Sequence, residues 1–291
     1  MTPLNVALIV KGSASNYERN MRNMGWWSYP VQEFTWKHFW LGDRPVNTRQ
    51  FDEFDLVFHE DGGNWCKYNR LSDIPIVFLS VDSTLSEAHY QQRLAIAEQA
   101  DLVLVDHDQL KRFPGSRRWS YCVNDRVFKP LEKEIDITFH CGTGARKGMP
   151  GGVERTEMRQ YLNGVAKDRG YSYRSGAMGL LDYAGNMGKS RVIVNWPRTP
   201  INRPHRVFDA MACGACLVTG KLPDVTGDYT MPGLHYVDYE DKREIEMVLP
   251  ALLNGGWQDI AAKGYELVML RHTWAIRAKE LRNILSEVFG L

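Results

Sequence analysis

Apolar runs alternate with polar turns along the first part of the chain, and their lengths predict short strands and one helix. The runs 4–10, 55–59, 75–81 and 101–105 are apolar along most of their length, and a helix is expected at about 85–99. Strands with continuous rather than alternating apolar residues are typical of parallel sheets covered on both faces. The order and spacing of these elements therefore predict a doubly wound, Rossmann-like α/β domain.

The second part of the chain carries the same pattern and ends in helices. Its expected elements are strands at 136–141, 171–173 and 190–196, helices at 154–167 and 204–213, and three helical segments at 242–253, 257–270 and 273–289. Between the two parts, residues 110–133 are rich in lysine and arginine and contain the breakers Pro114 and Pro130. We therefore expect two α/β domains, 1–130 and 131–291.

The most informative stretch runs from Lys189 to Gly220 and predicts a strand, a helix and a second strand. On the helix, His205, Arg206 and Asp209 fall opposite the apolar residues and near the N-terminal end, where they are expected to face a ligand or water. Free N–H groups and the positive end of the helix dipole favour a phosphate there. An aspartate beside it can accept hydrogen bonds from sugar hydroxyls.

These residues resemble the nucleotide-sugar half of GT-B glycosyltransferases, in particular the spore-maturation-type (CgeB-like) group. In that group a lysine-serine pair opens a strand that ends in asparagine, and an R-x-F-(E/D)-A-M-A-x-G helix follows. The matching residues here are Lys189, Ser190, Asn195 and the run from Arg206 to Gly214. The group usually has glutamate where this chain has Asp209, so the charge is kept and the reach is shorter.

The resemblance implies a GT-B fold, in which two Rossmann-like domains with parallel sheets face each other across a cleft and helices end the chain. It also implies transfer of a sugar from a nucleoside diphosphate sugar, such as a UDP-sugar, to an acceptor. Domain 131–291 would bind the donor and domain 1–130 the acceptor. The expected donor-binding residues, taken from this resemblance and from the positions of further polar and basic side chains, are Asp209, Arg206, His205, Lys189, Ser190, Asn195, Arg198, Arg146, Arg155 and Gly214. No metal or other cofactor is expected, because the cations can neutralise a diphosphate.

In this scheme Asp209 binds donor hydroxyls, and Arg206 with the other cations stabilises the diphosphate leaving group. Many retaining members of the group carry a second acidic residue eight positions before the helix acid. This chain has Ile201 at that position, which leaves the stereochemical outcome open.

A catalytic base would come from the first domain, where three polar residues end predicted strands. His59, Asp61 and Asp82 are the candidates, because open α/β sheets bind ligands at the carboxyl ends of their strands. Spacing does not single out one of them.

Acceptor contacts are expected from two other segments of the first domain. Gly12 and Ser13 lie in the turn after the first strand, which borders the cleft in GT-B enzymes. Trp26, Trp27 and Trp36 belong to a segment dense in aromatic residues, which can stack on bases or sugar rings or simply pack together. The acceptor could be a nucleobase in DNA, as in phage DNA glucosyltransferases, or a small molecule or glycan.

Two other functions fit parts of the sequence. Asp106 and Asp108 could hold a divalent ion against a diphosphate, as in GT-A-like transferases. The chain could also bind a nucleotide sugar without turning it over, since no catalytic base is certain.

Composition narrows the picture only slightly. Among 291 residues, 35 acidic and 36 basic side chains nearly cancel, so net charge predicts no polyanionic partner. The apolar run at the start is too short for a membrane span and lacks a cleavage site, which favours the cytoplasm. Five scattered cysteines argue against a disulfide framework.

Overall fold

The computed structural model describes ten segments of the chain. These are residues 2–10, 30–40, 45–60, 67–80, 87–106, 110–140, 152–176, 178–197, 204–222 and 229–291. The chain forms two compact units, of which unit 1 comprises Met1–Tyr121 and Ala275–Leu291 and unit 2 comprises Cys122–Trp274. Unit 1 thus ends nine residues before the boundary expected after residue 130, and it also includes the last helix.

Unit 1 is built on a six-stranded parallel sheet in the order β2-β1-β4-β6-β7-β8. Its strands are β1 (Leu4–Val10), β2 (Phe34–Trp40), β4 (Leu56–Glu60), β6 (Ile76–Ser80), β7 (Leu102–Val105) and β8 (Arg117–Arg118). Every residue of β4 and β6 is buried: the apolar runs that begin the two strands predict this, and the polar residues His59, Glu60 and Ser80 at their carboxyl ends are buried as well. The doubly wound α/β prediction is confirmed, and β2 is a strand that the sequence pattern did not reveal.

Smaller elements complete unit 1. They are a parallel pair of short strands, β3 (Val46–Asn47) and β5 (Tyr68–Asn69), the 3-10 helix η3 (Thr48–Phe51), and the helices α2 (Glu87–Ala97) and α8 (Trp274–Phe289). Phe51 and Ile96 pack with Ile76 and Phe78 in one hydrophobic core. The indole N–H of Trp119 donates to the Arg277 carbonyl at 3.1 Å, which ties α8 to this unit.

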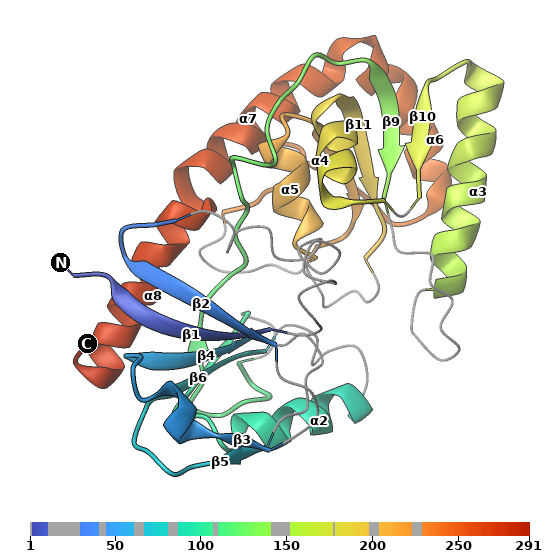
Figure 1. Ribbon diagram of the computed structural model, residues 1–291. Helices are drawn as coiled ribbons and strands as arrows, with labels where there is room; N and C mark the ends of the chain where they lie inside the picture. The colour runs from blue at the N-terminus through green and yellow to red at the C-terminus, as the bar shows by residue number, and fades with distance from the viewer. Residues whose placement is uncertain are drawn as a thin grey trace. The chain divides into compact units, whose positions relative to one another are not determined.

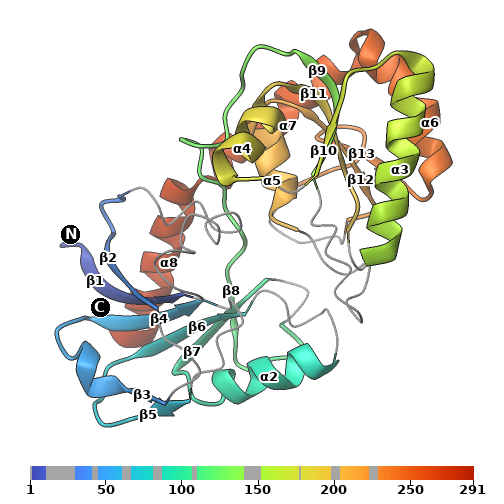
Figure 2. The ribbon, with the colours of Figure 1, turned by 45° about the vertical axis from the view of Figure 1, so that its right-hand side comes forward.

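Unit 2 contains a five-stranded parallel sheet in the order β10-β9-β11-β12-β13, of which Figure 1 labels β9, β10 and β11 and Figure 2 labels all five strands. Its strands are β9 (Ile135–Phe139), β10 (Tyr173–Ser175), β11 (Ser190–Asn195), β12 (Cys216–Gly220) and β13 (Val237–Tyr239). Its helices are α3 (Gly152–Arg169), α4 (Leu180–Gly188), α5 (Arg206–Ala212), α6 (Lys242–Ala251), the π-helix η5 (Leu252–Gly256) and α7 (Trp257–Arg271). The sheet has α3 and α6 on one side and α4 and α5 on the other (Figure 2).

Two contacts hold α4 and α5 in place on the sheet. Lys133 Nζ donates to the carbonyls of Gly188 and Cys213, both at 2.8 Å, and so joins the C-terminal ends of the two helices. Gly214 follows α5 with φ +58°, and a Cβ atom there would come within 3.1 Å of Pro130. The backbone therefore requires glycine at this turn. Because the C-terminal ends of α4 and α5 lie together at Lys133, their N-terminal ends lie at the carboxyl edge of the sheet.

Candidate functional site

Polar side chains from several elements meet at the carboxyl edge of the sheet in unit 2. Asn195 is the last residue of β11, and His140 directly follows β9. Because α3, α4 and α5 each follow a strand of a parallel sheet, their first turns lie at the same edge and bring Arg155, Tyr183 and Arg206 there. Ligands of open α/β sheets bind at this edge.

Asn195 is the fixed point of the cluster. It is buried, and its amide nitrogen donates to Thr219 Oγ1 at 2.8 Å while its backbone carbonyl accepts from Tyr239 Oη at 2.7 Å. The amide oxygen therefore points to Arg206, whose Nε donates to it at 3.2 Å. Among the described residues, Nη1 and Nη2 of Arg206 make no hydrogen bond, so Arg206 is held by one nitrogen and keeps two for another partner.

Asp209 lies next to Arg206 on α5 but is only 3% exposed. Burial raises its pKa well above the usual value, and Arg206 and the Tyr183 hydroxyl oppose this shift. Its Oδ2 lies 3.9 Å from His205 Nε2 and has no hydrogen-bond partner within the described part of the chain. The carboxyl group of Asp209 therefore does not face water: α5 turns it inward beside Tyr183.

Arginines on both sides make this edge electropositive. Arg155 is 3% exposed, and its Nη2 donates to the Trp196 carbonyl at 3.2 Å. Burial, followed by the charges of Arg206 and Arg155, lowers the pKa of His205 to about 3. His205 is therefore neutral near pH 7, and the arginines supply the positive charge.

His140 is part of the cluster although no motif pointed to it. Its ring packs edge-on against Tyr183, with ring centroids 5.4 Å apart, and Nδ1 lies 3.1 Å from the Gly176 carbonyl. Burial is the main reason that its pKa falls to about 4, with a smaller contribution in the same direction from Arg206. Its position directly after a buried parallel strand was the only signal in the sequence that could have identified it.

Three of the expected donor-binding residues do not join this cluster. Lys189 and Ser190 stand at the start of β11, and at about 3.3 Å per residue they are roughly 15–20 Å from Asn195 along the strand. Lys189 Nζ is 2.9 Å from Glu134 Oε2, and Ser190 is buried and donates to the Asn186 carbonyl at 2.6 Å. Gly214 follows the C-terminal end of α5, away from the cluster.

The candidates in the first domain are mostly outside the described residues. These are Asp61, Asp82, Asp108, Gly12, Ser13, Trp26 and Trp27, together with Arg146 and Arg198 of the second domain. His59 is 0% exposed and its Nδ1 lies 2.8 Å from Tyr68 Oη. Trp36 packs on β2 against Phe34 and Phe58.

The described residues show neither a metal site nor a membrane-spanning helix. Asp106 is 6% exposed and accepts from Ser120 Oγ at 3.4 Å. No three histidine, cysteine, aspartate or glutamate side chains come together as a metal site in the described segments. In the same segments, no helix is both long and apolar enough to cross a bilayer.

Comparison with known families identifies the family of the chain. The model of the family described as glycosyl transferase-like matches residues 128–283, more than half of the chain. The protein therefore belongs to the glycosyl transferase-like family. A search of curated protein sequences gives no match.

Several solved glycosyltransferase structures are similar to the whole chain. Anabaena HepE in complex with UDP-glucose has a TM-score of 0.63 and 11% identity, covering 98% of this chain and 100% of that one. An α-glucosyltransferase in complex with UDP-glucose and DNA containing an abasic site has a TM-score of 0.61 and 10% identity, with 98% and 100% covered. Sucrose-phosphate synthase from Thermosynechococcus elongatus has a TM-score of 0.58 and 14% identity, with 99% of both chains covered. This likeness concerns the fold and confirms the predicted GT-B type of α/β architecture.

Proposed function

We propose that the protein transfers a sugar from a nucleoside diphosphate sugar and that this donor binds at the carboxyl edge of the sheet in unit 2. The observation that carries the proposal is the convergence of Arg155, Arg206 and Asp209 at this edge. Guanidinium groups suit a diphosphate, and a carboxylate suits sugar hydroxyls. The UDP-glucose bound by HepE and by the α-glucosyltransferase supports a UDP-hexose as the donor.

Arg206 has the main role in the transfer step. When the bond between the anomeric carbon and the phosphate oxygen breaks, negative charge grows on the leaving diphosphate. The Nη1 and Nη2 groups of Arg206, which make no hydrogen bond to the described residues, bind that charge more strongly in the transition state than in the ground state. Because Asn195 already fixes Nε, the guanidinium needs little reorganisation.

Asp209 is assigned to the ribose hydroxyls of the donor. Its unpartnered Oδ2 is an acceptor in a buried place, and a hydroxyl pair would supply the hydrogen bonds that it lacks among the described residues. These bonds favour the ionised carboxylate and would return its raised pKa toward the usual value.

We further assign the chain to the CgeB-like group, on the motif from Arg206 to Gly214. Residues 131–291 form the donor part and residues 1–130 the acceptor part in this assignment. The acceptor is either a nucleobase in DNA or a small molecule or glycan. DNA affinity that falls steeply between about 50 and 200 mM salt supports the first, and absent binding supports the second.

Calorimetric titration tests the donor assignment. The full chain is titrated with UDP, UDP-glucose and other nucleotide sugars, and transfer is followed by UDP release with and without candidate acceptors. Asp209→Ala is expected to weaken binding of the preferred nucleotide sugar by about 10- to 100-fold. Unchanged affinity in this variant would contradict the role of Asp209, and binding without any turnover would favour a non-catalytic donor-binding protein.

A further inference from the structure

His140, in the cluster at the carboxyl edge of unit 2, offers a buried hydrogen-bonding atom to a ligand. The residue is 6% exposed, and its Nε2 has no hydrogen-bond partner among the described residues. Buried polar atoms in native proteins nearly always have a partner, so one that lacks it beside a binding edge points to a ligand. Asp209 Oδ2 lacks a partner in the same sense, and both residues contact Tyr183.

The chemistry of Nε2 follows from the other ring nitrogen. The Gly176 carbonyl can only accept a hydrogen bond, so Nδ1 of His140 carries the proton and donates to it at 3.1 Å. A neutral imidazole with its proton on Nδ1 has a lone pair and no hydrogen on Nε2. Burial and the charge of Arg206 both lower the pKa of His140, which keeps the ring neutral near pH 7.

A lone pair at Nε2 selects what can bind there. Ionised phosphate oxygens carry no hydrogen at neutral pH and would repel it, whereas an O–H or N–H group would donate to it. The cluster therefore separates two kinds of ligand atom, with anionic oxygens on Arg206 and hydrogen-bond donors on His140.

We propose that His140 is a specificity-determining residue whose Nε2 accepts a hydrogen bond from an O–H or N–H group of the bound nucleotide sugar. This inference rests on the proposed function, because it needs the donor to occupy this edge. The donated hydrogen comes either from the nucleoside, as a ribose hydroxyl or a base N–H, or from a hydroxyl of the transferred sugar. In this proposal His140 binds a neutral O–H or N–H group of the nucleotide sugar, and the arginines bind its charged diphosphate.

The test pairs variants of His140 with altered ligands. His140→Phe keeps a ring but removes the acceptor, and His140→Gln restores an acceptor close to the position of Nε2. The probes are UDP, UDP-glucose, 2′-deoxy-UDP, 3′-deoxy-UDP and UDP-glucose analogues that lack one hexose hydroxyl each. Affinities are measured by calorimetry on the full chain, and circular dichroism and thermal unfolding check that each variant folds.

We expect His140→Phe to weaken binding of UDP-glucose about 5- to 100-fold, and His140→Gln to recover most of that loss. The analogue that lacks the hydrogen-bonding group contacted by His140 should bind the native protein more weakly than UDP-glucose does, by a similar factor. The same analogue and UDP-glucose should bind His140→Phe with equal affinity. A coupled ribose analogue identifies a ribose contact, and a coupled hexose analogue identifies a sugar contact. If His140→Phe also binds UDP more weakly than the native protein does, and no hydroxyl analogue shows coupling, the contact is to the base N–H. N3-methyl-UDP, which lacks this N–H, then checks the assignment in the same way.

Two outcomes would overturn the inference, and only the second would also overturn the proposed function. If the native protein binds UDP-glucose and neither His140 variant couples to any probe, the role of His140 is wrong while the donor site stands. If the native protein binds none of the nucleotide sugars or UDP, the proposed function fails and the inference falls with it.

Discussion

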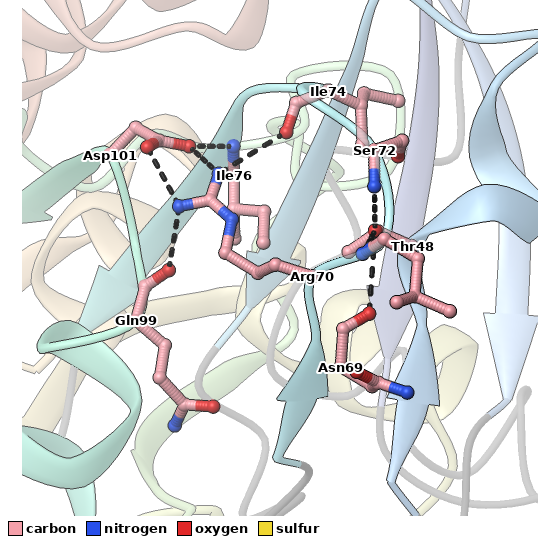
Figure 3. A network of polar contacts seen from close by, with 9 residues as sticks. Thr48, Asn69, Arg70, Ser72, Ile74, Ile76, Gln99 and Asp101 are labelled. Carbon is pink, nitrogen blue, oxygen red and sulfur yellow. Dashed lines mark hydrogen bonds and ion pairs between the residues drawn. The ribbon is translucent and has the colours of Figure 1, made fainter.

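One polar cluster in each unit shows how differently the protein satisfies its own hydrogen-bonding groups. At the amino edge of the sheet in unit 1, the two terminal nitrogens of Arg70 donate to the two carboxylate oxygens of Asp101, at 2.9 and 2.5 Å (Figure 3). Asp101 Oδ2 also accepts from Ile76 N at 2.8 Å, and Arg70 Nη2 reaches the Ile74 carbonyl at 3.4 Å. Each of these charged groups is bound by the other and by the backbone.

The Thr48 hydroxyl, next to this ion pair, also bonds to backbone groups of the protein. It is 0% exposed, and its Oγ1 accepts from Leu71 N at 2.8 Å and Ser72 N at 3.0 Å and donates to the Asn69 carbonyl at 3.4 Å (Figure 3). One hydroxyl thus satisfies three backbone groups of a turn. This network joins loops together and uses the charged groups of Arg70 and Asp101 mainly for contacts within the protein.

The cluster at the carboxyl edge in unit 2 is incomplete by comparison. Within the described residues, His140 Nε2 and Asp209 Oδ2 are buried without partners, and Arg206 uses only one of its nitrogens. The comparison teaches that burial alone does not distinguish a structural network from a binding site, because both clusters contain buried polar groups. Among the described residues, Ser72 Oγ of the unit 1 network is also buried without a partner, so the kind of group makes the distinction: in unit 2 the unpartnered atoms belong to a carboxyl group and an imidazole beside Arg206.

Removing the Arg206 guanidinium should have the largest effect on function. Arg206→Ala is expected to lower kcat/KM for sugar transfer by about 10²- to 10³-fold, because it removes a fixed positive group from the leaving diphosphate. The free energy of unfolding should fall by only about 1–2 kcal/mol, since the side chain is partly exposed and, among the described residues, bonded through Nε alone, although its loss leaves the buried Asn195 Oδ1 without that donor. Initial rates of UDP release and urea denaturation measure the two quantities. A rate loss below about tenfold would contradict the assignment.

Removing the Thr48 hydroxyl should affect stability and leave donor binding unchanged. Thr48→Val keeps the shape of the side chain but leaves Leu71 N and Ser72 N without their acceptor, so the free energy of unfolding should fall by about 2–3 kcal/mol. Thr48→Ser retains the hydroxyl and serves as the matched control, with an expected loss below about 1.5 kcal/mol. Equal destabilisation by both substitutions in urea denaturation would show that packing, and not the hydrogen bonds, makes Thr48 important.

The strands that are buried on both faces could be predicted from the sequence. The run 4–10 corresponds to β1 at Leu4–Val10, and 75–81 to β6 at Ile76–Ser80, because continuous apolar residues are required there. β2 at Phe34–Trp40 was missed, since its aromatic residues alternate with polar ones and suit an amphipathic segment as well as a strand. α4 was missed as well, so Tyr183 was absent from the expected site.

The site could be predicted only where its residues share one local motif. Arg206 and Asp209 lie on one helix and were found together, although the local pattern did not show that Asp209 is buried or that Tyr183 of another helix lies beside it. His140 depends on a carbonyl 36 residues later in the chain, a relation that no local pattern records. Lys189 is close to Asn195 in sequence, but the strand between them places the two residues at opposite edges of the sheet.

The buried carboxyl group of Asp209 in unit 2 should make the free energy of unfolding depend on pH. The raised pKa of Asp209 means that the folded protein keeps this proton at a pH where the unfolded chain has lost it. The contribution of the carboxyl group to the free energy of unfolding therefore falls as pH rises from about 4 toward the folded pKa, by up to about 1.4 kcal/mol per pH unit.

Asp209→Asn removes this titration and should become more stable relative to the native protein as pH rises over that window. Urea denaturation of both proteins at several pH values between about 4 and 7.5 measures the difference. Any hydrogen bond gained or lost by the new amide group is independent of pH and shifts the whole curve. Parallel curves for the two proteins would show that Asp209 titrates normally and that its burial is not a source of strain in the cluster.

An arginine at the other edge of the same sheet gives the smallest expected effect and the sharpest control for Arg206. Arg191 Nη1 lies 2.5 Å from Asp136 Oδ1, with side-chain exposures of 39% and 18%. Such partly exposed ion pairs contribute less than about 1 kcal/mol, and salt screens them. Arg191→Ala should therefore lower the free energy of unfolding by less than about 1 kcal/mol, with a smaller loss at about 1 M salt, and change donor affinity by less than about twofold. If it weakens donor binding as much as Arg206→Ala, the net positive charge of unit 2 drives binding, and the unpaired groups at the carboxyl edge do not.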